Sequence, residues 1–209
     1  MKTCYIFGAL DTKAVDFKPQ ENDLIIAADG GYSTLKKLSI KPDLVVGDFD
    51  SLGSAPDGEN IIKHPIKKDD TDTLLAIKIG FEKGYEKFVI YGAIGGRLDH
   101  TVATIQSATY VAQNGGIAYI CDDNHTVTAI KNSCIKFKAT AKGYISVFAL
   151  SGAAKGVTIN GLLYPLDNAE ILPDFPLGVS NEFLGKESAI SVSDGVLTII
   201  FEGKPSDIK

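Results

Sequence analysis

The chain has 209 residues, enough for one large domain or two small ones. Hydrophobic residues make up 44% of it and charged residues 22%, which is typical of a globular protein and excludes a disordered one. The formal net charge of −5 argues against a nucleic-acid-binding surface. The excess of acidic residues lies before Thr128.

The chain carries neither a signal-peptide pattern nor an apolar run of the roughly 20 residues that span a bilayer. Its three cysteines are widely spaced and form no C-x-x-C pair, which favours a reducing compartment. We therefore expect a cytoplasmic protein, with Cys4 as a small residue of the core.

The first part of the chain alternates short apolar runs with helical patterns. The runs are rich in Ile, Val, Phe and Tyr and are bounded by Gly or Asp, which predicts buried strands. The predicted strands are Cys4–Phe7, Leu24–Ala28, Leu44–Val46, Lys87–Tyr91 and Ile117–Cys121.

Thr71–Lys83 and Leu98–Gln113 have apolar residues at helical spacing. The faces predicted to be buried consist of Leu74, Ile77 and Phe81 in the first helix, and of Leu98, Val102, Ile105 and Ala112 in the second. Strands alternating with helices predict a Rossmann-like α/β domain, in which helices cover both faces of a mostly parallel sheet.

From about Thr126 the pattern changes to short strand-like runs separated by Gly, Asn, Asp and Ser. These runs are Ile135–Phe137, Tyr144–Leu150, Val157–Ile159, Ile190–Val192 and Leu197–Phe201. Without a helical period, they predict a smaller all-β sandwich of jelly-roll-like form. The change falls at residues 122–132, so we expect two domains, 1–125 and 126–209.

Polar clusters follow the predicted parallel strands, and the carboxyl ends of such strands are where ligands bind. Asp29-Gly30-Gly31 comes directly after Leu24–Ala28. Two glycines let the backbone approach a ligand and expose its N–H groups. The alternative is a tight turn with Asp29 as a helix cap.

Carboxylates dominate the next two clusters. In Gly47-Asp48-Phe49-Asp50-Ser51, two aspartates leave a buried strand together, and such a pair usually needs a cation or shares a proton. Oxygen ligands suit Mg²⁺, although a solvated acidic loop is the alternative. In Lys68-Asp69-Asp70-Thr71-Asp72, Thr71 or Asp70 is expected to cap the following helix, and Asp72 is a third candidate metal ligand.

A glycine-rich turn, Gly92-Ala93-Ile94-Gly95-Gly96-Arg97-Leu98-Asp99-His100, leads into the helix Leu98–Gln113. Such a turn at a helix N-terminus cradles phosphate, and Arg97 adds a planar fork of donors. Asp99 is placed to hold Arg97, and His100 to donate to a phosphate or to cap. Both G-x-G-x-x-G and G-x-x-x-x-G-K-[ST] are absent. The combined clusters suit a nucleoside triphosphate with Mg²⁺.

In order and spacing, these motifs resemble the catalytic domain of the thiamine pyrophosphokinase family. In the second part, Gly161-Leu162-Leu163-Tyr164-Pro165-Leu166 and Gly178-Val179-Ser180-Asn181-Glu182-Phe183 resemble that family's thiamine-binding domain. One departure is Leu163, where the family usually has a polar or charged residue. The resemblance implies a homodimer, with active sites between the catalytic domain of one subunit and the sandwich of the other.

The resemblance further implies that ATP donates its terminal pyrophosphoryl group to the hydroxyl of thiamine, releasing AMP. The expected metal ligands are Asp48, Asp50 and Asp72, the expected catalytic residues Asp72, Arg97 and Asp99, and Asp72 and Asp69 are alternative bases. ATP contacts are expected from Asp29, Gly30, Gly31, Gly47, Lys68, Asp69, Thr71, Gly95, Gly96, Arg97 and His100. Thiamine contacts are expected from Tyr164, Ser180, Asn181 and Phe183.

Two other functions fit parts of this pattern. The same aspartates could serve a Mg²⁺-dependent transferase that acts on a different alcohol, because the motifs of the second part determine the acceptor. A nucleotide-binding sensor without catalytic activity is the other alternative. The density of carboxylates at the strand ends disfavours it, since binding alone does not need so much uncompensated charge.

Overall fold

The computed structural model describes residues 2–12, 17–47, 61–63 and 70–209. They fall into two compact units. Unit 1 consists of Met1–Ser107 and Ile120–Asp123, and unit 2 of Ala108–Tyr119 and Asn124–Lys209. Each unit is described by itself below.

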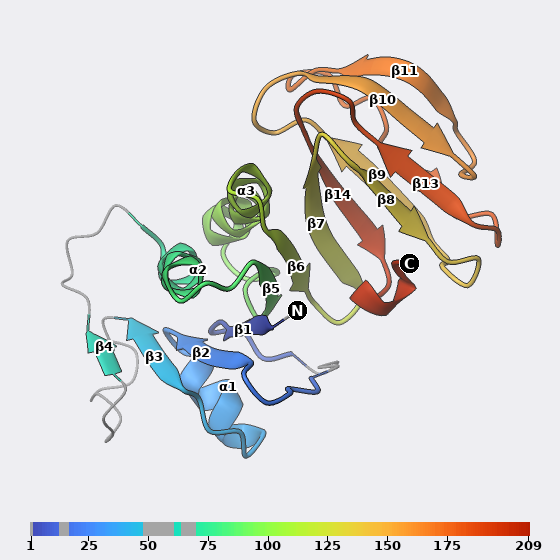
Figure 1. Cartoon of the computed structure of the whole chain (residues 1–209). Coiled ribbons are helices and arrows are strands. Elements are labelled where there is room, and N and C mark those ends of the chain that lie inside the picture. The colour runs from blue at the N-terminus through green and yellow to red at the C-terminus, as the bar shows by residue number, and fades with distance from the viewer. Residues whose placement is uncertain (1, 13–16, 48–60, 64–69) are drawn as a thin grey trace. The chain divides into compact units, whose positions relative to one another are not determined.

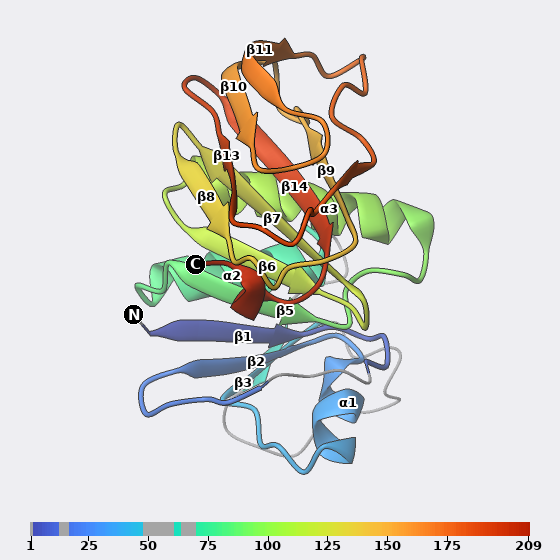
Figure 2. The same ribbon diagram turned by 90° about the vertical axis from the view of Figure 1, so that its right-hand side faces the viewer.

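Unit 1 contains a parallel sheet in which β5, β1, β2, β3 and β4 are neighbours in that order. Their bounds are β1 Thr3–Phe7, β2 Leu24–Ala28, β3 Leu44–Gly47, β4 Ile61–Lys63 and β5 Lys87–Tyr91. The central strand β1 pairs with β2 on one side and with β5 on the other, so Tyr5 lies between Ile25 and Val89. Figure 2 shows β1, β2 and β3 side by side.

Helix α1 (Gly31–Lys37) follows β2, and α2 (Asp72–Glu82) precedes β5; Figure 1 shows α2 above β2 and β3 and α1 below them. Thr71 caps α2 as predicted, because its Oγ1 accepts a hydrogen bond from the Leu74 amide at 3.3 Å. The predicted apolar face was only partly right, since Ile77 is buried but Leu74 and Phe81 are half-buried.

Helix α3 (Leu98–Gln113) has the predicted bounds, but its predicted apolar face was only partly right, since Ala112 is buried and Ile105 is half-buried. Leu98 is 77% exposed and Val102 is 49% exposed. Besides the predicted Ala112, the buried face consists mainly of small and hydroxyl-bearing residues: Thr104, Ser107, Ala108, Thr109 and Val111. Helical periodicity does not distinguish the two faces here, because hydroxyl groups can be buried once they are hydrogen-bonded. Ser107, for example, donates to the Ala103 carbonyl oxygen at 3.0 Å.

Unit 2 is built from two antiparallel sheets that share one apolar core. The first has the order β12-β9-β14-β7 and the second β11-β10-β13-β8. Their bounds are β7 His125–Lys131, β8 Cys134–Phe137, β9 Tyr144–Phe148, β10 Ala154–Asn160, β11 Leu166–Ile171, β12 Asn181–Glu182, β13 Ser188–Ser191 and β14 Val196–Glu202. Strand β6 (Ile117–Cys121) contributes to both units, and a 3₁₀ helix, η2 (Pro205–Asp207), follows β14.

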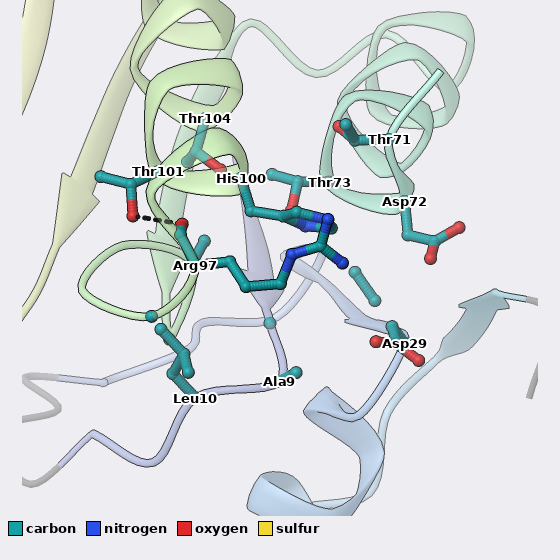
Figure 3. A pocket seen from close by; sticks show the side chains of 15 residues that line it. Ala9, Leu10, Asp29, Thr71, Asp72, Thr73, Arg97, His100, Thr101 and Thr104 are labelled. Atoms are coloured by element: carbon teal, nitrogen blue, oxygen red, sulfur yellow. Dashed lines mark hydrogen bonds between the residues drawn. The ribbon is translucent and has the colours of Figure 1, made fainter. Parts of the chain in front are cut away.

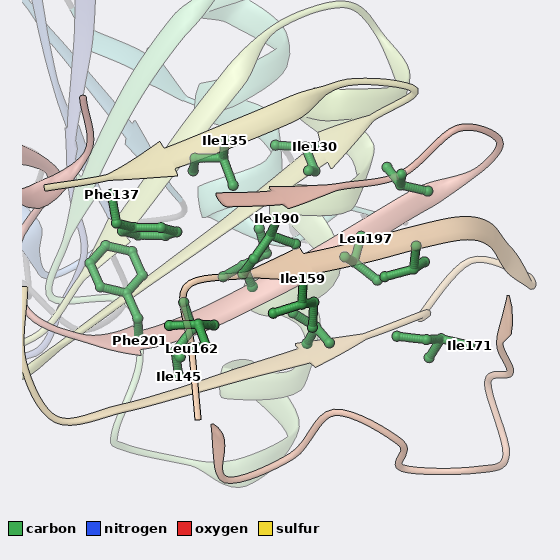
Figure 4. Packing of buried hydrophobic residues seen from close by; sticks show 14 of the residues in the cluster. Ile130, Ile135, Phe137, Ile145, Ile159, Leu162, Ile171, Ile190, Leu197 and Phe201 are labelled. Atoms are coloured by element: carbon green, nitrogen blue, oxygen red, sulfur yellow. The ribbon is translucent and has the colours of Figure 1, made fainter. Parts of the chain in front are cut away.

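The core between these sheets is formed by alternate residues of the strands (Figure 4). Phe137 is central to it, with its ring 5.1 Å from that of Phe201 and 5.2 Å from that of Phe183, both in edge-on contact. Unit 1 combines helices with a parallel sheet, and unit 2 consists mainly of antiparallel sheets. This confirms the predicted order of an α/β part followed by an all-β part. The finer Rossmann-like and jelly-roll-like assignments stay predictions.

A buried hydroxyl in this core predicts a stabilising substitution. Thr128 on β7 is fully buried, and its Oγ1 has no hydrogen-bond partner among the described residues. Thr128→Val keeps the shape and removes the unsatisfied group, so we expect the free energy of unfolding to rise by about 1 kcal/mol. Urea titration of the purified chain measures this difference.

Thr198 on β14 is the matched control. It is equally buried, but its Oγ1 lies 3.0 Å from Oγ1 of Thr109 and forms a hydrogen bond with it. Thr198→Val should therefore lower the free energy of unfolding by about 1 kcal/mol, because the Thr109 hydroxyl loses its partner. Equal and destabilising effects of both substitutions would contradict the assignment of Thr128 as unsatisfied.

None of the three cysteines forms a disulfide, and Cys4 and Cys121 are buried. Burial raises the pKa of the Cys4 thiol to about 12, which confirms its predicted place in the core. Across the part of the chain that the structure describes, no helix has the length and apolar character needed to span a membrane.

Candidate active site

A pocket of about 260 Å³ lies in unit 1, where strands of the parallel sheet end and helices begin. Its lining comes from the segments that follow β1, β2 and β5 and from the N-terminal turns of α2 and α3 (Figure 3). Carboxyl strand ends and helix N-termini are where open α/β sheets bind anionic ligands. The position of the pocket therefore agrees with the edge that the sequence predicts.

Close backbone contacts hold the segments after β1 and β5 together beside the pocket. The Gly8 amide donates to the Tyr91 carbonyl oxygen at 2.8 Å, and the Leu10 amide donates to that of Gly92 at 3.0 Å. A Cβ on Gly8 would lie 2.5 Å from the Gly92 carbonyl oxygen. Only glycine allows this approach, so Gly8 brings Ala9 and Leu10 into the pocket lining.

Asp29 lies at the end of β2 in a left-handed conformation, with φ at 51°. Its amide donates to the Val46 carbonyl oxygen at 2.8 Å, and a Cβ on Gly47 would lie 3.2 Å from the Asp29 Cα. A non-glycine residue in this region carries strain of order 1 kcal/mol, and such strain is common at functional sites. Asp29 lines the pocket, half-buried.

Three consecutive residues at the start of α2, Thr71, Asp72 and Thr73, line the pocket. Asp70, the residue before Thr71, forms an ion pair with Lys78 of α2. The Lys78 Nζ donates to the two carboxylate oxygens of Asp70 at 2.8 and 2.7 Å. Both side chains are about a third exposed, at 38% and 29%. The pair ties the residue before the cap to the helix itself, so it helps to fix where α2 begins.

Arg97 is the only arginine in the chain, and it lines the pocket at the start of α3. Its Nη2 donates to Asp99 Oδ2 at 2.6 Å and its Nε donates to Asp99 Oδ1 at 3.2 Å. The hydrogen bond from Arg97 lowers the pKa of Asp99 below its ordinary value and raises the pKa of Arg97 in return. Both side chains are mostly exposed, at 71% and 65%, so the guanidinium keeps donors available to a ligand.

The structure brings five of the predicted ATP contacts into the pocket lining: Asp29, Thr71, Gly96, Arg97 and His100. Asp72, from the predicted catalytic and metal sets, lines it as well. Asp48, Asp50, Lys68 and Asp69 lie outside the described residues. Gly30, Gly31, Gly47, Gly95 and Asp99 do not line the pocket. For Gly31 the reason is packing, because a Cβ added to it would overlap the Phe7 carbonyl oxygen.

Sequence reasoning missed Gly8, Ala9, Leu10, Thr73, Thr101 and Thr104 in the lining. Gly8 had a detectable signal, since it directly follows the first predicted strand. The three threonines had none, because a hydroxyl in a helical pattern does not by itself show whether it faces solvent or a ligand.

The donor set of this pocket suits a hard cation. The carboxylates of Asp29 and Asp72 supply oxygen ligands, which is what Mg²⁺ prefers. Among the described residues, three or more carboxylate, imidazole or thiol side chains do not gather at one point. Two of the three expected metal ligands, Asp48 and Asp50, lie outside that part of the chain.

The residues expected to contact thiamine lie in unit 2 and differ in exposure. Tyr164 is 61% exposed and Ser180 is also exposed, with a left-handed φ of 58°. Phe183 is 9% exposed and packs on Phe137.

Asn181 is 3% exposed, and its side chain binds the backbone of Tyr164 on both sides. Oδ1 accepts from the Tyr164 amide at 2.9 Å, and Nδ2 donates to the Tyr164 carbonyl oxygen at 2.7 Å. Oδ1 also accepts from the Glu182 amide at 2.9 Å. This amide therefore fixes the segment that carries Tyr164, and one N–H remains for any other contact.

A parallel sheet with glycine turns, two helix N-termini and an arginine at its carboxyl edge defines an α/β protein suited to a phosphate-bearing ligand. Residues 18–120 match the family model of the thiamin pyrophosphokinase catalytic domain, and residues 132–197 match that of the thiamin pyrophosphokinase vitamin B1 binding domain. The chain belongs to the thiamin pyrophosphokinase family.

Individual relatives agree with this membership. Thiamine pyrophosphokinase from Bacillus subtilis is 32% identical over 188 residues, which cover 86% of this chain and 87% of the relative. The crystal structure of thiamine pyrophosphokinase from Bacillus subtilis superposes with a TM-score of 0.84 at 27% identity, covering 97% of this chain and 100% of the other. That of thiamin pyrophosphokinase from Geobacillus thermodenitrificans gives 0.81 at 25% identity, covering 98% and 99%.

Proposed function

We propose that this chain transfers the terminal pyrophosphoryl group of ATP to the hydroxyl of thiamine, giving thiamine pyrophosphate and AMP. Membership of the thiamin pyrophosphokinase family over both units supports the reaction. The single structural observation that carries the proposal is the pocket in unit 1, which combines helix N-termini, a glycine turn, Arg97 and carboxylates. A triphosphate with a divalent cation needs this combination.

In this reaction the hydroxyl oxygen of thiamine attacks the β-phosphorus of ATP. A bond forms between that oxygen and the β-phosphorus, while the bond from the β-phosphorus to the oxygen shared with the α-phosphate breaks, so AMP leaves. The hydroxyl proton is lost as the new bond forms, and a loose transition state demands little of a base. Asp72 and Asp69 stay alternative bases.

The chain's own residues would act mainly by positioning and by charge. Arg97 is placed to donate to oxygens of the transferred group, where negative charge is concentrated in the transition state. Asp99 holds the guanidinium in a fixed plane through two hydrogen bonds. The first amides of α3, together with the helix dipole, favour an anion at the same place. Asp99 is therefore proposed to act through Arg97.

Asp72, with Asp48 and Asp50, is proposed to hold Mg²⁺ together with triphosphate oxygens and water. The carboxylate oxygens of the pocket support this choice of ion. When bound, Mg²⁺ neutralises charge on the triphosphate oxygens. The proposed thiamine pocket uses Tyr164 as a wall and Ser180 as a hydrogen-bonding group, with Asn181 and Phe183 supporting them from the buried side.

We further propose a homodimer located in the cytoplasm, with the active site completed across the subunit interface. Large apolar side chains that are exposed in the single chain support an interface, among them Leu98 and Val102 in unit 1 and Tyr164 and Leu184 in unit 2. Three cysteines that form no disulfide support a reducing compartment. A monomer in sedimentation equilibrium at micromolar concentration would refute the dimer.

Product analysis tests the proposed reaction. The purified chain is incubated with ATP, Mg²⁺ and thiamine, and AMP and thiamine pyrophosphate are quantified by chromatography. We expect equal amounts of both products, and neither without thiamine or without Mg²⁺. Equal amounts also establish attack at the β-phosphorus, because that is the only attack that yields AMP together with the pyrophosphoryl ester.

Other products would contradict specific parts of the proposal. ADP with thiamine monophosphate would overturn the point of attack. AMP formed only with another alcohol would overturn the acceptor. Nucleotide binding without turnover on any alcohol would support the non-catalytic sensor instead.

A further inference from the structure

The hydroxyl of Thr101, in the first turns of α3, binds two groups of the preceding glycine turn. Oγ1 donates to the Arg97 carbonyl oxygen at 3.1 Å and accepts from the Gly95 amide at 3.2 Å. The Thr101 amide also donates to the Arg97 carbonyl oxygen, at 3.0 Å. Figure 3 shows Thr101 beside the Arg97 backbone at the pocket, with the hydrogen bond between them drawn. One hydroxyl thus closes the segment from Gly95 to Arg97 into a loop.

Few other contacts define the shape of this loop. Gly95 is exposed, has φ of +101°, and has open space where a Cβ would lie. Gly96 packs against the Leu10 side chain, which is flexible. Within the described residues, the bond from the Gly95 amide to Thr101 is the only hydrogen bond made by backbone groups of 93–96. Removing that hydroxyl should therefore let the loop adopt other conformations.

The same contact decides which amides can face a ligand. The Gly95 amide, expected to donate to the transferred group, is engaged by Thr101. The amides of Gly96, Arg97 and Leu98 make no hydrogen bond to any described residue, as expected for the first N–H groups of a helix. Gly96 and Arg97 also line the pocket. The hydroxyl therefore orients the part of the turn that carries the remaining donors.

We propose that Thr101 is a positioning residue for pyrophosphoryl transfer, which rests on the function proposed above. By tying the Gly95 amide to the Arg97 carbonyl oxygen, its hydroxyl holds the Gly96 and Arg97 amides and the base of the Arg97 side chain in the arrangement that receives the triphosphate. Thr101 acts through these groups, so its loss should affect the use of ATP and leave the affinity for thiamine unchanged.

Three variants of the full chain test this role. Thr101→Val keeps the shape and removes the hydroxyl, while Thr101→Ser keeps the hydroxyl and removes the methyl group. Ser107→Ala is the matched control, because Ser107 donates the same kind of hydrogen bond to a carbonyl four residues earlier on α3 but does not line the pocket. Initial rates are measured with ATP and thiamine varied separately.

We expect Thr101→Val to lower kcat/KM for ATP by about 10-fold, the effect of losing one hydrogen bond that orders the donors. The KM for thiamine should stay unchanged. Thr101→Ser should restore kcat/KM to within about 2-fold of the wild type, and Ser107→Ala should match the wild type. Hydrogen exchange of the Gly95 amide should be about 10-fold faster in Thr101→Val alone.

Wild-type kcat/KM for ATP in Thr101→Val would overturn the proposal, as would an equal loss in Ser107→Ala. A wild-type chain that forms no thiamine pyrophosphate would refute the proposed function instead. The positioning role is then tested by calorimetric titration with inorganic tripolyphosphate and Mg²⁺. Weaker binding to Thr101→Val than to the wild type and Thr101→Ser supports it, and equal or absent binding in all three overturns it.

Discussion

Arg97→Ala is expected to lower the turnover number for thiamine pyrophosphate formation by on the order of 10³-fold. The chain places its one arginine at the pocket and uses lysine at every other basic position, although lysine supplies the same charge. What arginine adds is a rigid planar fork that can donate to Asp99 and to phosphate oxygens simultaneously. Steady-state kinetics with both substrates saturating measures the loss.

Two further variants distinguish the effect of the planar guanidinium group from the effect of its charge and from a loss of stability. Arg97→Lys keeps the charge but lacks the fork, so it should recover only a small part of the lost turnover. Lys37→Ala is the control, because it removes an exposed cation paired with Asp11 at 2.7 Å, away from the pocket lining. It should retain wild-type turnover. Full activity in Arg97→Ala with an unchanged melting temperature would refute the assigned role.

Gly31→Ala is expected to lower the free energy of unfolding by about 3 kcal/mol or more. Gly31 begins α1 at the point where the helix crosses the end of β1, and an added Cβ would overlap the carbonyl oxygen of Phe7. Backbone atoms cannot rotate away as a side chain can, so either α1 or the central strand must shift. Because the Phe7 strand end continues into Gly8 and Ala9, the pocket should be distorted as well.

Gly84→Ala is the control for this substitution. Gly84 also belongs to unit 1 and has φ of +76°, but its nearest contact to an added Cβ is the end of the flexible Lys2 side chain at 3.6 Å. It should lose only about 1 kcal/mol, the cost of a left-handed conformation. Guanidinium titration followed by circular dichroism compares the two. Losses of equal size would show that the contact between α1 and β1 is not tightly packed.

The sequence predicted the buried elements that consist of uninterrupted runs of apolar residues. The strands Leu24–Ala28 and Lys87–Tyr91 have the predicted bounds, because both faces of a parallel sheet are covered and the runs are apolar except for Lys87. Strand β7 was not predicted, since residues 122–132 were interpreted as the connection between domains. Its threonines, Thr126 and Thr128, are fully buried, although threonine is mostly a surface residue.

The candidate site could be predicted only at positions where the chemistry requires a charged residue or a glycine. Asp29, Asp72 and Arg97 follow from the rule that ligands bind at the carboxyl ends of parallel strands, and all three line the pocket. Glycines were harder to interpret, because Gly31 allows close packing between a helix and a strand and does not line the pocket. That distinction depends on which backbone atom lies opposite the missing Cβ, and only three-dimensional structure provides it.

The buried side chain of Asn181 has a consequence for how acceptor preference can change over evolution. It binds the amide and carbonyl groups of residue 164 and makes no use of the tyrosine ring, which is 61% exposed. The backbone of that segment is thus held independently of the amino acid that it presents. Exchange of the ring for another side chain leaves these anchoring bonds intact. If Tyr164 forms a wall of the thiamine pocket, as proposed, selectivity at this position can change by single substitutions without a matching loss of folding stability.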